Sequence, residues 1–218
     1  MKPSILAVAA VVTLAVPASL HAQQAPLMRG DVAGTVGWLN GNKTEVHSQS
    51  NDWYNRGLYL GAQAGWYWTD HHKTEVEAGI TAPIDFWTYR SFTVDGVTAW
   101  GGSDFTYKLG RVAVGQHYQL LRNAWVHPYV GAGVDVTWER STERAEPLII
   151  YDYTGRGPRE IRPGGTFGPD TTVRVRPYLQ TGFKAYMNRR AFFRSDLRVL
   201  VRDRLDEVLL RCGFGIDF

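Results

Sequence analysis

The sequence predicts an all-β fold, a single antiparallel up-and-down transmembrane β-barrel of about eight strands that follows a cleaved signal peptide. Three observations support this prediction. Segments of about ten residues alternate apolar and polar side chains along the chain, which is the period of a strand with one apolar face. Charged residues gather on the face opposite the apolar one. The amino terminus has the form of an export signal.

The export signal begins with the basic residue Lys2, continues as an apolar run over residues 5–16 and ends in small residues before Ala22. We expect cleavage after Ala22, with Ala18 as the alternative site. The domains are then a signal peptide over residues 1–22 and an outer-membrane β-barrel domain over residues 23–218. The apolar run is too short to cross a bilayer as a helix.

The composition of the exported part excludes some classes of protein. Its 23 Lys and Arg against 21 Asp and Glu are too balanced to favour nucleic acid. Cys212 is the single cysteine, so no intramolecular disulfide can form. The 8 Trp, 11 Tyr, 9 Phe and 23 Gly are typical of a barrel with aromatic girdles. We expect no cofactor, no metal and no catalytic residue.

The alternation predicts eight strands in chain order. They cover residues 31–39, 57–68, 73–82, 104–118, 125–140, 171–187, 191–201 and 208–218. In the fourth strand Tyr107 and Leu109 share one phase, whereas Val112 and Val114 share the other. This change of phase predicts a β-bulge near residues 109–111.

The connections between these strands alternate in length. The long ones, residues 40–55, 83–103 with a turn at Asp95-Gly96, and 141–170, are predicted to share one side of the membrane. An even number of strands leaves both chain ends on the other side, with the short turns.

The charges of the polar face predict what fills the barrel. The residues concerned are Glu75, Glu77, Asp135, Arg174, Arg176, Lys184, Arg194, Asp196, Arg198, Arg202, Arg211 and Asp217. Both signs occur in similar numbers, and the interior of an eight-stranded barrel is just wide enough for side chains to fill it. We therefore expect a lumen without an open pore, filled by ion pairs and hydrogen bonds.

Three segments, together with the signal peptide, carry a resemblance to a known family. They are HPYVGAGVDVTW at 127–138, FFRSDLRVLV at 192–201 and LLRCGFGIDF at 209–218. They resemble the eight-stranded outer-membrane β-barrel domain of OmpA/OmpX type, over essentially the whole exported chain. The resemblance implies location in the bacterial outer membrane and an assembly signal made by Phe214, Ile216 and Phe218.

The resemblance also implies partners. These are outer-membrane lipid and lipopolysaccharide, with the barrel assembly machinery and periplasmic chaperones during biogenesis, for a chain that is a monomer. It says little about function, because the family includes structural, adhesive and enzymatic proteins. We expect a structural role, surface interaction through the long outer loops, or both. The alternatives are a lipid A deacylase or acyltransferase, a small channel, and a soluble lipocalin-like barrel with its apolar face inward.

The enzyme alternative needs a Ser–His–acid set near the outer leaflet. His117 and His127 flank the short turn at residues 121–124, on the opposite side of the membrane. His47 lies beside Ser48 in an outer connection, but the spacing identifies no partner acid. His71 and His72 are adjacent in a turn with no third metal ligand nearby in the sequence.

Two further groups lie in the long connections. The arginines could bind lipopolysaccharide phosphates, or pair with Glu139, Glu143, Glu146 and Glu160 in a solvated hairpin. They are Arg140, Arg144, Arg156, Arg159 and Arg162. The aromatic residues favour an outer girdle with strands extended above the membrane, and a ligand-binding lip is the alternative. They are Phe86, Trp87, Tyr89, Phe92 and Trp100.

Overall fold

The computed structural model describes residues 28–41, 55–94, 97–120, 125–152, 157–202 and 205–218. The predicted signal peptide lies outside these residues and stays a prediction. No helix within the described ranges is long and apolar enough to cross a membrane.

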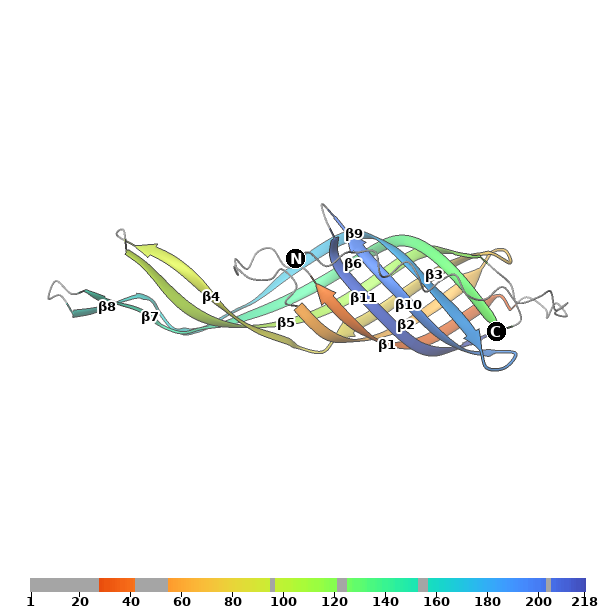
Figure 1. Ribbon diagram of the computed structural model, residues 1–218, viewed down its shortest axis with the longest axis horizontal. Coiled ribbons are helices and arrows are strands. Elements are labelled where there is room, and N and C mark those ends of the chain that lie inside the picture. Colours follow the sequence, from red (N-terminus) through yellow and green to blue (C-terminus); the bar gives the residue numbers. More distant parts are fainter. Residues whose placement is uncertain (1–27, 42–54, 95–96, 121–124, 153–156, 203–204) are drawn as a thin grey trace, which may run out of the picture.

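Eight antiparallel strands form a closed ring (Figure 1). They are β1 (Gly30–Gly41), β2 (Asn55–Tyr67), β3 (His72–Thr81), β5 (Val97–Gln119), β6 (Val126–Ala145), β9 (Gly165–Tyr186), β10 (Ala191–Val201) and β11 (Leu205–Asp217). Their order is β3-β2-β1-β11-β10-β9-β6-β5, and pairing of β3 with β5 completes the ring. Closure satisfies the backbone donors and acceptors that an open sheet would leave at its edges. The predicted barrel is confirmed.

The barrel has two different ends. At the short-turn end lie the connections β2–β3, β5–β6 and β9–β10, together with the carboxyl terminus. At the extended end β5, β6 and β9 continue well past the other five strands of the ring (Figure 1). They are 23, 20 and 22 residues long, whereas a tilted strand crosses hydrocarbon in about ten residues.

Two predicted connections are therefore wrong. Most of residues 83–103 form β4 (Ile84–Val94) and the first part of β5, which pair with each other. Most of residues 141–170 extend β6 and β9 or form the hairpin of β7 (Leu148–Asp152) and β8 (Gly157–Arg162). The turn at Asp95-Gly96 lies outside the described residues. The first of these segments is rich in Thr, Val and aromatic residues, which favour strands once a neighbouring strand offers its backbone groups. The second has no Val and is rich in Gly, Arg and Pro, so its strands depend on pairing with their neighbours and not on residue preference.

The apolar face of the strands points away from the barrel axis. On the last strand Leu210, Phe214 and Ile216 expose 53–61 % of their surface, while Leu209 and Arg211 on the other face are buried. The same alternation exposes Val76, Val112 and the other apolar outward residues of the ring. The predicted orientation, with its apolar face outward, is confirmed, and it leaves an apolar belt around the barrel.

The predicted β-bulge in the fourth strand is wrong. The pairing of β5 with β6 runs without a shift from Ser103 to Gln119. Tyr107 and Leu109 are buried inside the barrel, in phase with Arg111. The change of phase in the sequence reflects a change in the interior from apolar to charged, because the strand keeps its alternation throughout.

An apolar cap fills the interior at the extended end. It consists of the buried side chains of Leu39, Tyr59, Ile84, Phe105, Tyr107, Leu109 and Leu209. Gly61 and Gly79 make room for the ring of Tyr59, since a Cβ atom at either position would collide with it. The interior thus contains an apolar part at the extended end in addition to its charged part.

The outward orientation predicts how an arginine at position 76 behaves. Val76 is half exposed in the middle of the apolar belt. Val76→Arg should reduce the free energy of unfolding in phosphatidylcholine vesicles by about 2–4 kcal/mol, because a charge at that depth loses hydration. Urea titration followed by tryptophan fluorescence measures this change.

The control is Phe167→Arg, at an exposed position of β9 beyond the barrel. It should change the free energy of unfolding by no more than about 0.5 kcal/mol. Equal effects of the two substitutions would mean that the face carrying Val76 does not meet lipid.

Candidate functional site

The charged residues of the polar face lie inside the barrel, with two exceptions. Buried there are Glu75, Glu77, Asp135, Arg176, Lys184, Arg194, Asp196, Arg198, Arg211 and Asp217. Arg174 is only half buried, and its Nε lies 3.8 Å from Glu139. Arg202 is exposed. Its predicted place in the lumen is wrong, because β10 ends at Val201 and the alternation stops there.

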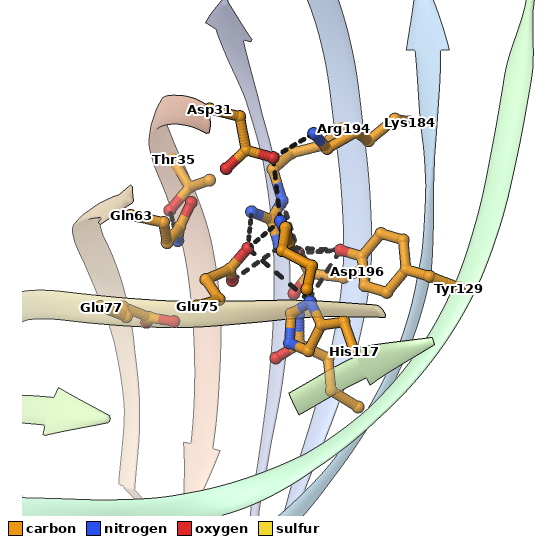
Figure 2. Close-up of polar contacts among 12 residues, drawn as sticks. Asp31, Thr35, Gln63, Glu75, Glu77, His117, Tyr129, Lys184, Arg194 and Asp196 are labelled. Atoms are coloured by element: carbon orange, nitrogen blue, oxygen red, sulfur yellow. Dashed lines mark hydrogen bonds and ion pairs between the residues drawn. The ribbon is translucent and has the colours of Figure 1, made fainter. Parts of the chain in front are cut away.

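Fourteen of the buried charged side chains form one chain in which acids and bases alternate. From the short-turn end it runs Asp217, Lys184, Asp31, Lys73, Glu75, Arg194, Asp196, Arg211, Glu77, Arg198, Asp135, Arg111, Glu207 and Arg176. We call this chain the charge ladder. Each inner member contacts two groups of opposite sign, so no inner member depends on a single charged partner. Figure 2 shows the side chains of Asp31, Lys184, Glu75, Arg194 and Asp196 converging from several strands.

At the short-turn end two lysines share the carboxylate of Asp31. The Nζ atom of Lys73 lies 3.0 Å from Asp31 and 2.6 Å from Glu75. Lys184 bonds to the same oxygen of Asp31 and lies 3.3 Å from Asp217. The hydroxyl of Tyr67 donates to Asp31 and accepts from Lys184. This satisfaction of donors is what makes buried ammonium groups tolerable.

In the middle of the barrel the guanidinium of Arg194 joins two carboxylates. It donates to both oxygens of Glu75 at 2.9 and 3.1 Å, and its Nη2 lies 2.9 Å from Asp196. Asp196 also accepts a 2.7 Å bond from Nε of Arg211 and a 3.0 Å bond from the hydroxyl of Tyr129. Bidentate pairing of this kind orients both partners as well as stabilising them.

Toward the extended end the ladder is looser. Glu77 accepts from Arg198, Arg211 and Tyr59. The next carboxylate, Asp135, lies 3.7 Å from Arg198 and 3.8 Å from Arg111, beyond hydrogen-bond length. Facing atoms of these three side chains lack a hydrogen-bond partner. Buried atoms of this kind and spacing are suited to a bridging water molecule.

Four ladder residues are not among the lumen charges predicted from sequence. Asp31 and Lys73 have the right phase but lie at strand ends. Glu207 falls before the predicted start of its strand, since β11 begins at Leu205. Arg111 was missed because the wrongly predicted bulge left the orientation of its side chain undetermined. A consistent count of every second residue, carried to the strand ends, would have identified all four.

The histidines lie in different places. His117 is buried, stacks on Tyr129 with the ring centroids 5.1 Å apart, and has Nδ1 at 3.7 Å from Glu75. His127 packs against Tyr186. His71 bonds through Nδ1 to the carbonyl oxygen of Gln119. His47 and Ser48 lie outside the described residues. No cluster of metal-ligating side chains occurs among the residues that the structure describes.

Four of the five arginines that the sequence placed in an outer connection lie on strands. Arg140 and Arg144 are exposed on β6, and Arg159 and Arg162 belong to β8. Arg156 lies outside the described residues. All five aromatic residues that were predicted to form the girdle belong to β4 or β5. Among them, Trp87 is half exposed.

β4 and the outer parts of β5, β6 and β9 form a sheet that extends beyond the barrel, and we call it the protruding sheet. This sheet has an open edge. β9 pairs with β6 as far as Gly165, but its pairing with β10 ends at Tyr178. Pro177 lacks the N–H that would extend this second ladder. The N–H of Met187 points toward β10, so by alternation the N–H of Thr171 points to the same side, where no described strand pairs with it.

The predicted assembly-signal residues share one location. Phe214, Ile216 and Phe218 project from β11 to the outside of the barrel and expose 53–61 % of their surface. The ring of Phe214 also packs edge-on against Phe193 of β10.

The ladder predicts a large effect of neutralising one carboxylate. Glu77→Gln leaves the buried cations Arg198 and Arg211 without their shared negative charge. The free energy of unfolding should fall by about 3–5 kcal/mol. Urea unfolding in detergent micelles measures it, with Asp104→Asn on the exposed face of β5 as the control. A loss no larger than in the control would show that the ladder is not needed for stability.

No family model matches the sequence, and no curated protein matches it. Solved structures do match. Neisserial surface protein A is 13 % identical with a TM-score of 0.50, over 87 % of this chain and 97 % of that one. Ail of Yersinia pestis is 12 % identical with a TM-score of 0.48, over 88 % and 100 %. The amino-terminal barrel domain of Pseudomonas aeruginosa OprF is 11 % identical with a TM-score of 0.47, over 88 % and 98 %.

At such low identity a structural likeness shows the fold alone. The ring of eight strands, the apolar exterior and the likeness to the neisserial protein agree with one another. The chain has the fold of the eight-stranded outer-membrane β-barrels of OmpA/OmpX type.

Proposed function

We propose that this chain is an integral protein of the bacterial outer membrane whose barrel is a sealed anchor and whose protruding sheet binds a partner outside the cell. The observation that carries the proposal is the extension of β5, β6 and β9, to about twice the length that a membrane requires. Strands of this length would be unnecessary if the barrel served only to fill the membrane.

The sealed anchor is supported by the contents of the lumen. The charge ladder crosses the barrel from Asp217 to Arg176, and the apolar cap fills the interior beside its last members, with Leu209 between Arg211 and Glu207 on β11. An ion would have to break several buried pairs and pass between buried apolar side chains. Both steps cost far more free energy than thermal motion supplies.

The surface role is supported by the edge of β9. An open edge offers N–H and C=O groups on which an extended peptide can add as a further strand. Proteins usually protect such edges, and here Pro169 and Pro177 bracket a stretch that keeps its donors. We infer that an extended segment of an external protein pairs with the stretch that includes Thr171.

The sealed lumen predicts the behaviour of the protein in planar lipid bilayers. The folded chain should give no steady current steps at moderate voltage, in contrast to a porin measured in the same chamber. Steady ion-sized steps would contradict the sealed lumen and favour a small channel.

The edge predicts different effects of two substitutions at one position. Thr171→Pro removes the outward N–H but leaves the bonds to β6, whereas Thr171→Ala keeps the N–H and removes only the side chain. Cells that display the chain should adhere to immobilised extracellular-matrix proteins, and adhesion should be lost with Thr171→Pro and kept with Thr171→Ala.

A deletion of residues 148–162 provides the second control, since it removes the β7–β8 hairpin and leaves the edge of β9. Equal adhesion by the proline and alanine variants would rule out pairing at the edge. Adhesion no stronger than that of cells without the chain would rule out the surface role.

A further inference from the structure

Two cations face each other on the outside of the barrel, with no ion-pair partner among the residues that the structure describes. Lys108 of β5 and Arg140 of β6 are directly opposite in the strand register, and both side chains are exposed on the outer face. Like charges at directly opposed positions of neighbouring strands repel each other. Neither side chain has an ion pair within the described part of the chain. Such a pair is stabilised when an anion lies between the two cations.

The place of this pair relative to the apolar belt indicates the source of the anion. The row of outward residues just below it consists of Ile80, Gly110, Trp138 and Val173. Three of these are large apolar side chains that are 42–60 % exposed. Lys108 and Arg140 thus begin the polar surface where the belt ends, at the level of lipid headgroups. Aromatic residues such as Trp138 favour the same level.

The belt lacks a side chain at one position directly below the two cations, and we call this position the notch. Gly110 lies between Ile80 and Trp138 in the register, and a Cβ atom there would meet no atom within 4 Å. The space leaves room for the glycerol or sugar group that joins a phosphate to its acyl chains. On β4, the strand next to this part of β5, the carboxylate nearest to Lys108 in the register is that of Asp85. It accepts a 2.6 Å hydrogen bond from Thr106.

We propose that Lys108, Arg140 and the notch at Gly110 bind the phosphomonoester headgroup of a membrane lipid. The inference rests on the proposed location in the outer membrane. A phosphomonoester carries close to two negative charges at neutral pH, which matches two cations, whereas a phosphodiester carries one. Arginine binds such a group through two parallel hydrogen bonds and lysine binds it as a point charge.

Titration of the folded barrel with a short-chain lipid tests the site. The protein is held in uncharged maltoside micelles, and dioctanoyl phosphatidic acid is added. The indole N–H resonance of Trp138, assigned with Trp138→Phe, reports binding beside the two cations. We expect a saturable shift with phosphatidic acid, a weaker affinity for dioctanoyl phosphatidylglycerol, and no shift with dioctanoylglycerol.

The variants separate the site from general surface charge. Lys108→Gln with Arg140→Gln should weaken binding of phosphatidic acid about 30-fold, since each basic residue near a lipid phosphate contributes on the order of a fivefold gain. Arg144→Gln is the matched control, because Arg144 is also exposed on β6 but lies opposite Asp104. It should leave the affinity unchanged.

Three results would overturn the proposal. They are equal affinity of the double variant and the unchanged protein, equal weakening by Arg144→Gln, and binding of inorganic phosphate as tight as that of phosphatidic acid. Heat modifiability on gels, measured in the same samples, shows whether the barrel is folded. A chain that never forms a heat-modifiable barrel contradicts the proposed function, whereas a folded barrel that fails the titration contradicts only the lipid site.

Discussion

The charge ladder is the interaction on which the rest of the barrel depends. Buried charges are tolerable only when each has partners, and here every inner member has two. The ladder takes residues from seven of the eight ring strands, and β2 adds the hydroxyl groups of Tyr59 and Tyr67. A slip of one residue in any strand would turn its charges toward lipid and its apolar side chains inward. The ladder therefore ties the register of every strand to that of its neighbours.

Apolar side chains stabilise this barrel in two places for different reasons. On the outside they form the belt. Their exposure there carries no hydrophobic penalty when lipid, and not water, surrounds the barrel. Inside, at the extended end, the apolar cap packs around Tyr59, whose hydroxyl also reaches Glu77 of the ladder. The cap and the ladder are thus joined by one side chain. At the extended end the interior therefore contains the apolar cap and the last members of the ladder side by side.

The protruding sheet follows from unequal strand lengths. β5, β6 and β9 continue to pair with one another after β10 and β11 have ended, so three strands leave the ring as an open sheet. An open sheet has edges, and the edge of β9 is exposed on both faces from Gly165 to Val173. The structure therefore combines a closed sheet in the barrel with an open sheet outside it. The proposed anchor and binding roles correspond to these two parts.

Alternation of side chains by itself located the eight strands of the ring and, except in β5, showed which face of each is apolar, because period two is a local property. It placed residues 191–201 and the outward Phe214 as the structure has them. It could not determine partners, since contacts such as Lys73 with Asp31 depend on strands far apart in sequence. Only the tertiary structure decided that Tyr107 points inward, that β6 and β9 extend through the supposed loop, and that Lys108 faces Arg140. The physical reason is register, which is set jointly by all strands of a closed ring.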